Sequence, residues 1–210
     1  MIVSIARELG AGGRSVGEAI ASAIGAALLD ERSIIEELAQ RSELPAEFVA
    51  DHLERPPSRG ERLIADLASA SAMLFTMPWE QPDTVLIATV RDLVLEYAAK
   101  GHVVVIGHGG RSMLGWRPDA FDVLAILLRA GREWRIEQLA RRYAIDRAEA
   151  QRRIERTDAA RVRYQRHYFD SDLYDARQYD LVLCPQTLGL DVAIRLATDA
   201  ARAHTALRAT

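Results

Sequence analysis

The sequence predicts an α/β fold in which five parallel strands are covered by helices on both faces. Apolar, β-branched segments such as 102–106 and 121–128 have the composition of strands that are buried on both sides of a parallel sheet. Segments with helical periodicity separate these strands, and that alternation favours parallel pairing. The first apolar run leads directly into a glycine-rich turn and a helix, a layout typical of anion binding at a helix N-terminus.

The elements follow from the apolar pattern taken in chain order. The predicted strands are 1–6, 26–29, 102–106, 121–128 and 179–184. The predicted helices are 15–24, 83–99, 129–143, 146–168 and 190–203. Segment 31–82 has helical patterning interrupted by proline-rich loops and no convincing central strand, so we interpret it as an insert. We therefore expect one domain with a core of 1–30, 83–145 and 171–210, an insert of 31–82, and an arginine-rich lid of 146–170.

Composition limits the classes of function. The chain has 210 residues, 49% of them hydrophobic, and a formal net charge of −3, which argues against a general nucleic-acid or membrane-surface binder. Lys100 is the only lysine, so the positive charge is almost all arginine, whose planar fork binds phosphate. The single cysteine, Cys184, follows an apolar run and is interpreted as a buried structural thiol. No apolar stretch is long enough for a membrane span, and we expect a cytoplasmic protein.

The glycine-rich turn is a candidate phosphate-binding loop. Against the pattern G-x-x-x-x-G-K-[ST], the stretch 8–15 has Glu8 in place of the first glycine and Arg14 in place of the lysine, and it keeps the hydroxyl at Ser15. Backbone N–H groups of a tight turn can converge on one anion. We expect the loop Gly10, Ala11, Gly12, Gly13, Arg14 and Ser15 to bind phosphates and Ser15 to ligate Mg²⁺. The alternative is a plain glycine-rich turn between a strand and a helix.

Further candidates lie at strand ends and in the arginine-rich segments. Asp30 follows the second strand, where it either contacts a ligand or caps the next helix. His108 lies in the Gly107–Ser112 turn after the third strand, and it either contacts substrate or satisfies local backbone. Arg32, Arg91 and Arg111 are candidates to bind an acceptor phosphate. For most arginines of 146–168, a solvated, salt-bridged helix face is the expected role.

Several segments together resemble the cytidylate kinase-like family of P-loop nucleoside monophosphate kinases. They are 5–17, Leu29–Asp30 with the following helix, 103–110, 158–161 with 164–169, and 179–183. The resemblance implies a P-loop kinase core with strand order 2-3-1-4-5, a helical monophosphate-binding insert and an arginine lid. It also implies ATP with Mg²⁺ as donor and CMP or dCMP as acceptor, in a protein that is a monomer or a homodimer.

The resemblance also implies roles for individual residues. Arg156 and Arg161 match lid arginines, Asp158 matches the lid carboxylate, and Arg91 matches a phosphate-binding arginine. The chain departs from true cytidylate kinases at Arg14, where they have lysine, and at the turn 107–110, where they have Asp-Gly-Arg-Asp. His108 also stands where an arginine is usual in the cytidylate kinase-like relatives.

Three functions remain open at the level of sequence. The first is ATP-dependent phosphorylation of a pyrimidine nucleoside monophosphate, in which Arg14, Arg156, Arg161 and Asp158 would act in catalysis. The second is a non-catalytic nucleotide-binding or regulatory protein, which the loss of the loop lysine would favour. The third is a P-loop kinase of another small metabolite, because this fold carries many acceptors.

Overall fold

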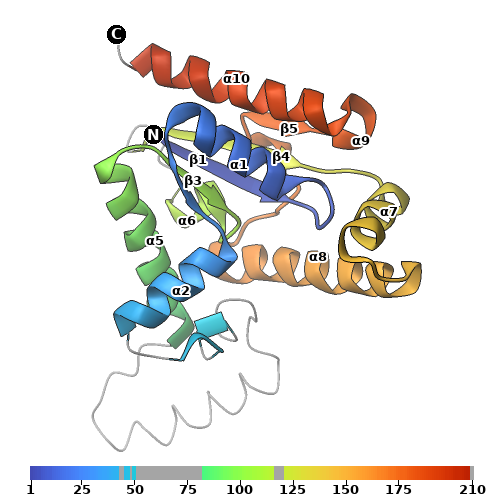
Figure 1. Ribbon diagram of the computed structural model, residues 1–210. Helices are drawn as coiled ribbons and strands as arrows, with labels where there is room; N and C mark the ends of the chain where they lie inside the picture. The colour runs from blue at the N-terminus through green and yellow to red at the C-terminus, as the bar shows by residue number, and fades with distance from the viewer. Residues whose placement is uncertain (43–44, 48, 51–81, 116–120, 209–210) are drawn as a thin grey trace, which may run out of the picture.

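The protein is built around a five-stranded parallel sheet (Figure 1). The computed structural model describes residues 1–42, 45–47, 49–50, 82–115 and 121–208. The strands are β1 (Ile2–Arg7), β2 (Ala27–Leu29), β3 (Val103–Ile106), β4 (Val123–Leu128) and β5 (Leu181–Leu183). They are arranged in the order β2-β3-β1-β4-β5, and every pair is parallel. This confirms the predicted sheet and its strand order.

The longer helices lie close to the predicted segments, and two short helices occur where the sequence predicted turns. They are α1 (Gly13–Ile24), α2 (Glu31–Ser42), α5 (Pro82–Lys100), α6 (Gly110–Met113), α7 (Arg132–Tyr143), α8 (Arg147–Phe169), α9 (Pro185–Leu188) and α10 (Leu190–Arg208), with a 3₁₀ turn η1 (Ala176–Gln178). Most of the predicted insert, including 51–81, lies outside the described residues. No helix in the described ranges is long and apolar enough to cross a membrane.

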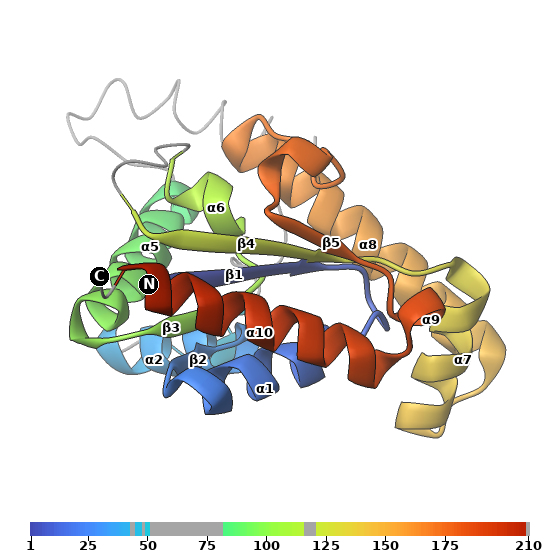
Figure 2. The same cartoon turned by 90° about the horizontal axis from the view of Figure 1, so that it is seen from above.

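Alternation along the strands divides the core into two faces. Val3 and Ile5 of β1, with their neighbours on β3 and β4, pack against α1 and α10. Ile2 and the alternate valines of β3, Val103 and Val105, pack with α2 and α5 on the other face. Figure 2 shows α1 and α10 side by side on one face of the sheet, with α5 and α6 on the other. Because all five strands run the same way, their carboxyl ends meet at one edge, where a ligand site is expected.

Candidate functional site

The turn between β1 and α1 has the geometry of an anion cradle. Gly10 and Gly12 have φ angles of 85° and 87°, a left-handed conformation that side chains other than glycine rarely adopt. The turn is also tightly packed, since a Cβ atom on Gly12 would lie 2.6 Å from Leu190 Cδ1 at the start of α10. No described acceptor pairs with the backbone N–H groups of Gly13, Arg14 and Ser15, which begin α1. These donors and the positive end of the helix dipole are available to an anion.

Glu8, Arg135 and Asp158 form a largely buried ionic cluster that holds the glycine loop in place. Arg135 of α7 is 6% exposed, and its Nη1 donates to Asp158 Oδ2 at 2.5 Å and to the carbonyl oxygen of Leu9 at 3.1 Å. Asp158 Oδ1 accepts the N–H of Leu9 at 2.9 Å. Glu8 Oε2 accepts the N–H of Ala130 and lies 3.6 Å from Arg135 Nε. The cluster therefore joins the loop to both α7 and α8.

Asp158 lies on α8, within the predicted lid segment, and its carboxylate contacts the glycine loop and Arg135. Both of its oxygens are used by the loop and by Arg135, and it is not among the residues that line the cleft described next. In this structure Asp158 is a positioning residue for the loop, and a direct part in phosphoryl transfer stays a prediction.

A cavity of about 800 Å³ opens above the loop. Residues from α2 and the segment after it form one wing, including Ile35, Glu36 and Ala46. The other wing comes from α7 and the start of α10, and it brings the rings of Trp134 and Tyr143 together with the charge of Arg142. The glycine loop lies in the floor between the wings, with Gly10, Gly12, Gly13, Arg14 and Ser15 lining it, while Ala11 is fully buried behind it.

Arg14, Ser15 and Asp30 all line this cavity. Arg14 is half exposed, donates from Nε to Glu18 Oε1 at 2.8 Å, and has Nη1 3.6 Å from Asp30 Oδ2. Asp30 Oδ1 caps α2 by accepting the N–H of Ser33 at 2.9 Å, and the residue also lines the cavity, so its contact with a ligand stays a prediction. The Ser15 hydroxyl lines the cavity and makes no hydrogen bond with a described residue.

Oxygen-bearing side chains on the cavity wall could hold a magnesium ion. Mg²⁺ prefers oxygen ligands and is usually held by one or two protein groups together with substrate phosphates. Ser15, Asp30 and Glu31 all line the same cavity, which is the donor set this mode requires. The described residues contain no cluster of three or more acidic, histidine or cysteine side chains that could form a separate metal cage.

Arg7, Arg161 and His108 meet deeper in the site. Arg7 ends β1, and Arg161 Nη1 of α8 donates to its carbonyl oxygen at 3.2 Å. Burial, and then the charge of Arg161, lower the pKa of Arg7 to about 9. Burial also lowers the pKa of Arg161. His108 has a left-handed φ of 53°, and burial followed by the charges of Arg7 and Arg161 lowers its pKa to about 3, so the imidazole is neutral at pH 7.

The remaining predicted arginines are dispersed. Arg32 lines the cavity mouth but is 82% exposed and pairs with Glu36 at 2.7 Å. Arg91 pairs with Asp92 at 3.1 Å and does not line the cavity. Arg156 is exposed, forms no ion pair with any residue that the structure describes, and does not line the cavity either.

Arg111 has a structural partner. It donates to the carbonyl oxygen of Val123 at 3.1 Å and forms an ion pair with Asp180, whose carboxylate also accepts the N–H of Ala125. Arg111 therefore ties α6 to the residues around β4 and β5. Its predicted contact with an acceptor phosphate stays a prediction.

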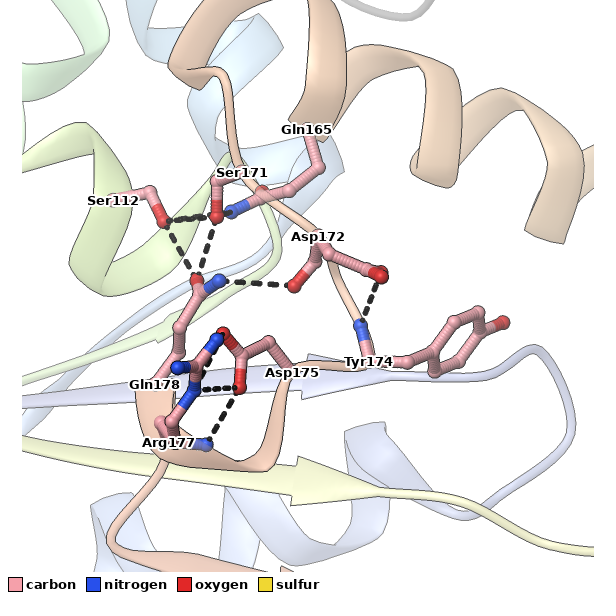
Figure 3. Close-up of polar contacts among 8 residues, drawn as sticks. All are labelled: Ser112, Gln165, Ser171, Asp172, Tyr174, Asp175, Arg177 and Gln178. Atoms are coloured by element: carbon pink, nitrogen blue, oxygen red, sulfur yellow. Dashed lines mark hydrogen bonds and ion pairs between the residues drawn. The ribbon is translucent and has the colours of Figure 1, made fainter.

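The C-terminal end of α8 is fastened to the core by a polar network. Figure 3 shows four side chains that point toward one another: Ser112 of α6, Gln165 of α8, Ser171 just after α8, and Gln178 of η1. Gln165 Nε2 donates to Ser112 Oγ at 2.7 Å, and Ser171 Oγ donates to Gln178 Oε1 at 2.7 Å. Because Gln165 follows Arg161 by one helical turn, this network also fixes the position of Arg161.

Sequence reasoning did not single out Arg7, Arg135, Trp134 or Arg142 as site residues. Arg7 carried a usable signal, because it is a charged residue at the carboxyl end of a buried parallel strand, where ligands bind. Trp134, Arg135 and Arg142 carried no such signal in the sequence. Whether Trp134, Arg135 or Arg142 faces the loop depends on how α7 packs, and helical periodicity does not reveal that.

Comparisons with known proteins identify a family and a shared fold. A sequence model of the cytidylate kinase-like family matches residues 2–187. A search of curated proteins gives no match. Among solved structures, an uncharacterized protein from Eubacterium ventriosum ATCC 27560 has a TM-score of 0.67 at 16% identity, over 96% of this chain and 98% of that one.

Two further structures are similar over nearly their full lengths. TT1252 from Thermus thermophilus has a TM-score of 0.53 at 17% identity, covering 95% of this chain and 97% of its own. A gluconokinase from Sinorhizobium meliloti 1021 has a TM-score of 0.52 at 16% identity, covering 98% and 94%. At these identities the similarity shows a shared fold.

Proposed function

The chain belongs to the cytidylate kinase-like family, and from that membership and its cleft we propose that it transfers a phosphoryl group from ATP to a nucleoside monophosphate, with CMP or dCMP as the expected acceptor. One observation carries the proposal. The unpaired N–H groups at the start of α1 and the arginines Arg7, Arg14 and Arg161 line a single cleft with a wing on either side. A kinase of this type needs such a cleft to hold two phosphorylated substrates with their phosphates facing.

The two wings suggest separate places for donor and acceptor. Trp134, Arg142 and Tyr143 of α7 line the cleft together with the loop, and two aromatic rings with a guanidinium suit a nucleobase and its phosphates. The opposite wing begins at α2, where the predicted acceptor-binding insert joins the core. We therefore assign ATP to the α7 wing and the monophosphate to the α2 wing.

The loop N–H groups and the charged side chains beside them would stabilise the phosphate charges electrostatically. The α1 N–H groups and Arg14 would bind donor phosphates, and Arg161 would offset charge on the group in transfer. Ser15 with Asp30 would hold Mg²⁺, which neutralises phosphate charge when it is bound. The half-buried position of Arg161 beside the cleft also limits the entry of water, which would otherwise compete as acceptor.

A coupled ADP-release assay with Mg·ATP and each nucleoside monophosphate tests the proposal. We expect turnover with CMP or dCMP and much slower turnover with AMP and GMP. Arg14→Ala should abolish turnover without unfolding the protein, while Arg202→Met on the exposed face of α10 should not change it. Absence of turnover with every monophosphate would refute the proposal.

One observation favours the alternative of a binding or regulatory protein. The guanidinium of Arg14 is already engaged by Glu18 and Asp30, so a phosphate must compete with two carboxylates. Calorimetry separates the two functions, because ATP binding without phosphoryl transfer to any acceptor supports the alternative. Turnover with a non-nucleotide hydroxyl compound in place of a monophosphate would instead indicate a kinase of another metabolite.

A further inference from the structure

Arg7 occupies a space that two glycines keep open. A Cβ atom on Gly107 would lie 2.1 Å from Arg7 Nη1, and one on Gly13 would lie 2.9 Å from Arg7 Cγ. These glycines belong to different elements, the turn after β3 and the first turn of α1. The side chain is only 14% exposed, so its charge is kept largely away from water. A buried charge is costly unless it is paired or meets a charged ligand.

The protein neutralises Arg7 and Arg161 only weakly. Arg7 lies 3.9 Å from Glu31, and Arg161 lies 4.0 Å from Asp158, so both ion pairs are at the limit of contact. Asp158 is already committed to Arg135 at 2.5 Å. No described residue accepts a hydrogen bond from the Arg7 guanidinium. Burial lowers the pKa of both arginines, and at Arg7 the charge of Arg161 lowers it further.

A second cavity, of about 50 Å³, adjoins these two arginines. Arg7 and Arg161 line both this small cavity and the main cleft, so they stand where the two spaces meet. Tyr164 also lines the small cavity, is 9% exposed, and its buried hydroxyl has no hydrogen-bond partner among the described residues. Because Tyr164 follows Arg161 by three positions on α8, the two side chains lie on one face of the helix.

These groups have the chemistry of a phosphate seat. Two guanidinium groups offer planar forks, and the Tyr164 hydroxyl offers one more donor. His108 completes the wall of the small cavity as a neutral imidazole, so the positive charge comes from the two arginines. The glycine loop residues 10–15 do not line the small cavity, which separates this seat from the donor cradle.

We propose that Arg7, with Arg161 and the hydroxyl of Tyr164, binds the monoester phosphate of the acceptor. This inference rests on the proposed function for the identity of the acceptor. The two arginines of the seat also line the main cleft together with the glycine loop, where an acceptor phosphate has to face the donor for in-line transfer. Arg7 is therefore a substrate-binding residue at a position outside the P-loop pattern.

Direct binding measured without ATP tests the seat. CMP, cytidine and, in a separate titration, ATP are added to the wild-type protein, Arg7→Met, Arg7→Lys and Tyr164→Phe, with Arg202→Met as a surface control. We expect Arg7→Met to weaken CMP binding about 10- to 100-fold, the range for a lost charge-assisted hydrogen bond, and to leave ATP and cytidine binding unchanged. Arg7→Lys should recover part of the loss because it keeps the charge without the fork.

Tyr164→Phe keeps the test decisive if the Arg7 variants fold poorly. It removes one oxygen that has no protein partner, so the thermal midpoint should not fall, while CMP binding weakens about 3- to 10-fold. Equal CMP affinity in Tyr164→Phe and the wild type, or an equal loss of CMP and cytidine binding in the Arg7 variants, would overturn the seat.

The outcomes also separate this inference from the proposed function. CMP binding that depends on Arg7, without turnover, would refute the kinase function and support the phosphate-binding site at Arg7. Turnover with an acceptor KM that Arg7→Met does not change would overturn the seat and keep the function. A wild-type protein that binds no nucleoside monophosphate would overturn both.

Discussion

Replacing Asp158 by alanine should destabilise the protein through the loop rather than through the lid. The substitution removes the acceptor for the Leu9 N–H and the 2.5 Å partner of Arg135, a side chain that is nearly inaccessible to water. Removing one member of a buried ion pair costs about 3–5 kcal/mol, and Glu8 at 3.6 Å compensates only in part. We therefore expect a loss of about 3 kcal/mol in the free energy of unfolding. In a chain of this size that corresponds to a fall in Tm of about 6–12 °C.

A double-mutant cycle measured by urea unfolding gives the energy of this pair. The cycle uses Asp158→Ala, Arg135→Met and the double variant, and we expect the double variant to be more stable than additivity predicts by at least about 1 kcal/mol. The exposed pair Asp199 and Arg202, 3.8 Å apart on α10, serves as the control and should show no measurable coupling. Additive effects at Asp158 and Arg135 would refute the reasoning, because the side chains would then not depend on each other.

Three further predictions concern the walls of the site. Gly107→Ala should lower the free energy of unfolding by about 1–3 kcal/mol, which is more than Gly25→Ala should. Both glycines have a positive φ, but only a Cβ atom on Gly107 would meet another side chain. Thermal unfolding of the two variants measures the difference. His108 is neutral when folded and has a pKa of about 3 against 6.5 when unfolded, so stability should fall as pH drops below about 6.5, by up to about 2 kcal/mol at pH 5. His108→Asn, which tolerates the same φ, should remove this part of the pH dependence in urea titrations at pH 5 and 7.5; an unchanged slope would contradict it. ATP should quench the fluorescence of Trp134, which lines the cleft. Trp134→Leu should abolish this quenching and weaken ATP binding without changing CMP binding. Unchanged quenching in Trp134→Leu would mean that the adenine base binds elsewhere.

The sheet could be predicted because its signals are local. Strands buried on both faces are continuous apolar runs, and parallel pairing follows from the helices between them. The glycine loop was predictable for the same reason, since two of its glycines have the left-handed φ that the pattern requires. The strand order 2-3-1-4-5 came from the family resemblance, because no local pattern specifies which strands are neighbours.

The arginines could not be assigned from sequence because their partners are distant in the chain. Asp158 meets Leu9, and Arg111 meets Asp180, only after the sheet has brought those segments together. The composition of 146–168 predicted a salt-bridged helix, and pairs such as Arg153 with Glu149 confirm that role for part of it. Arg161 lines the cleft because of where α8 lies, which is set in part by the Ser112–Gln165 hydrogen bond.

The two departures of the loop from the P-loop pattern have different consequences. Glu8 replaces a glycine at a position where φ is not positive, so it adds no backbone strain and supplies a carboxylate that fastens the loop through Ala130 and Arg135. Arg14 replaces the lysine with a fork that already binds Glu18 and lies near Asp30. It can reach a phosphate only by exchanging those partners, whereas the described carboxylates that pair with Arg7 and Arg161 lie at 3.9 and 4.0 Å. The positive charge most available to a phosphate therefore lies beside the loop, and substitutions at Arg7 and Arg161 should impair binding of the acceptor more than substitution of Arg14 does.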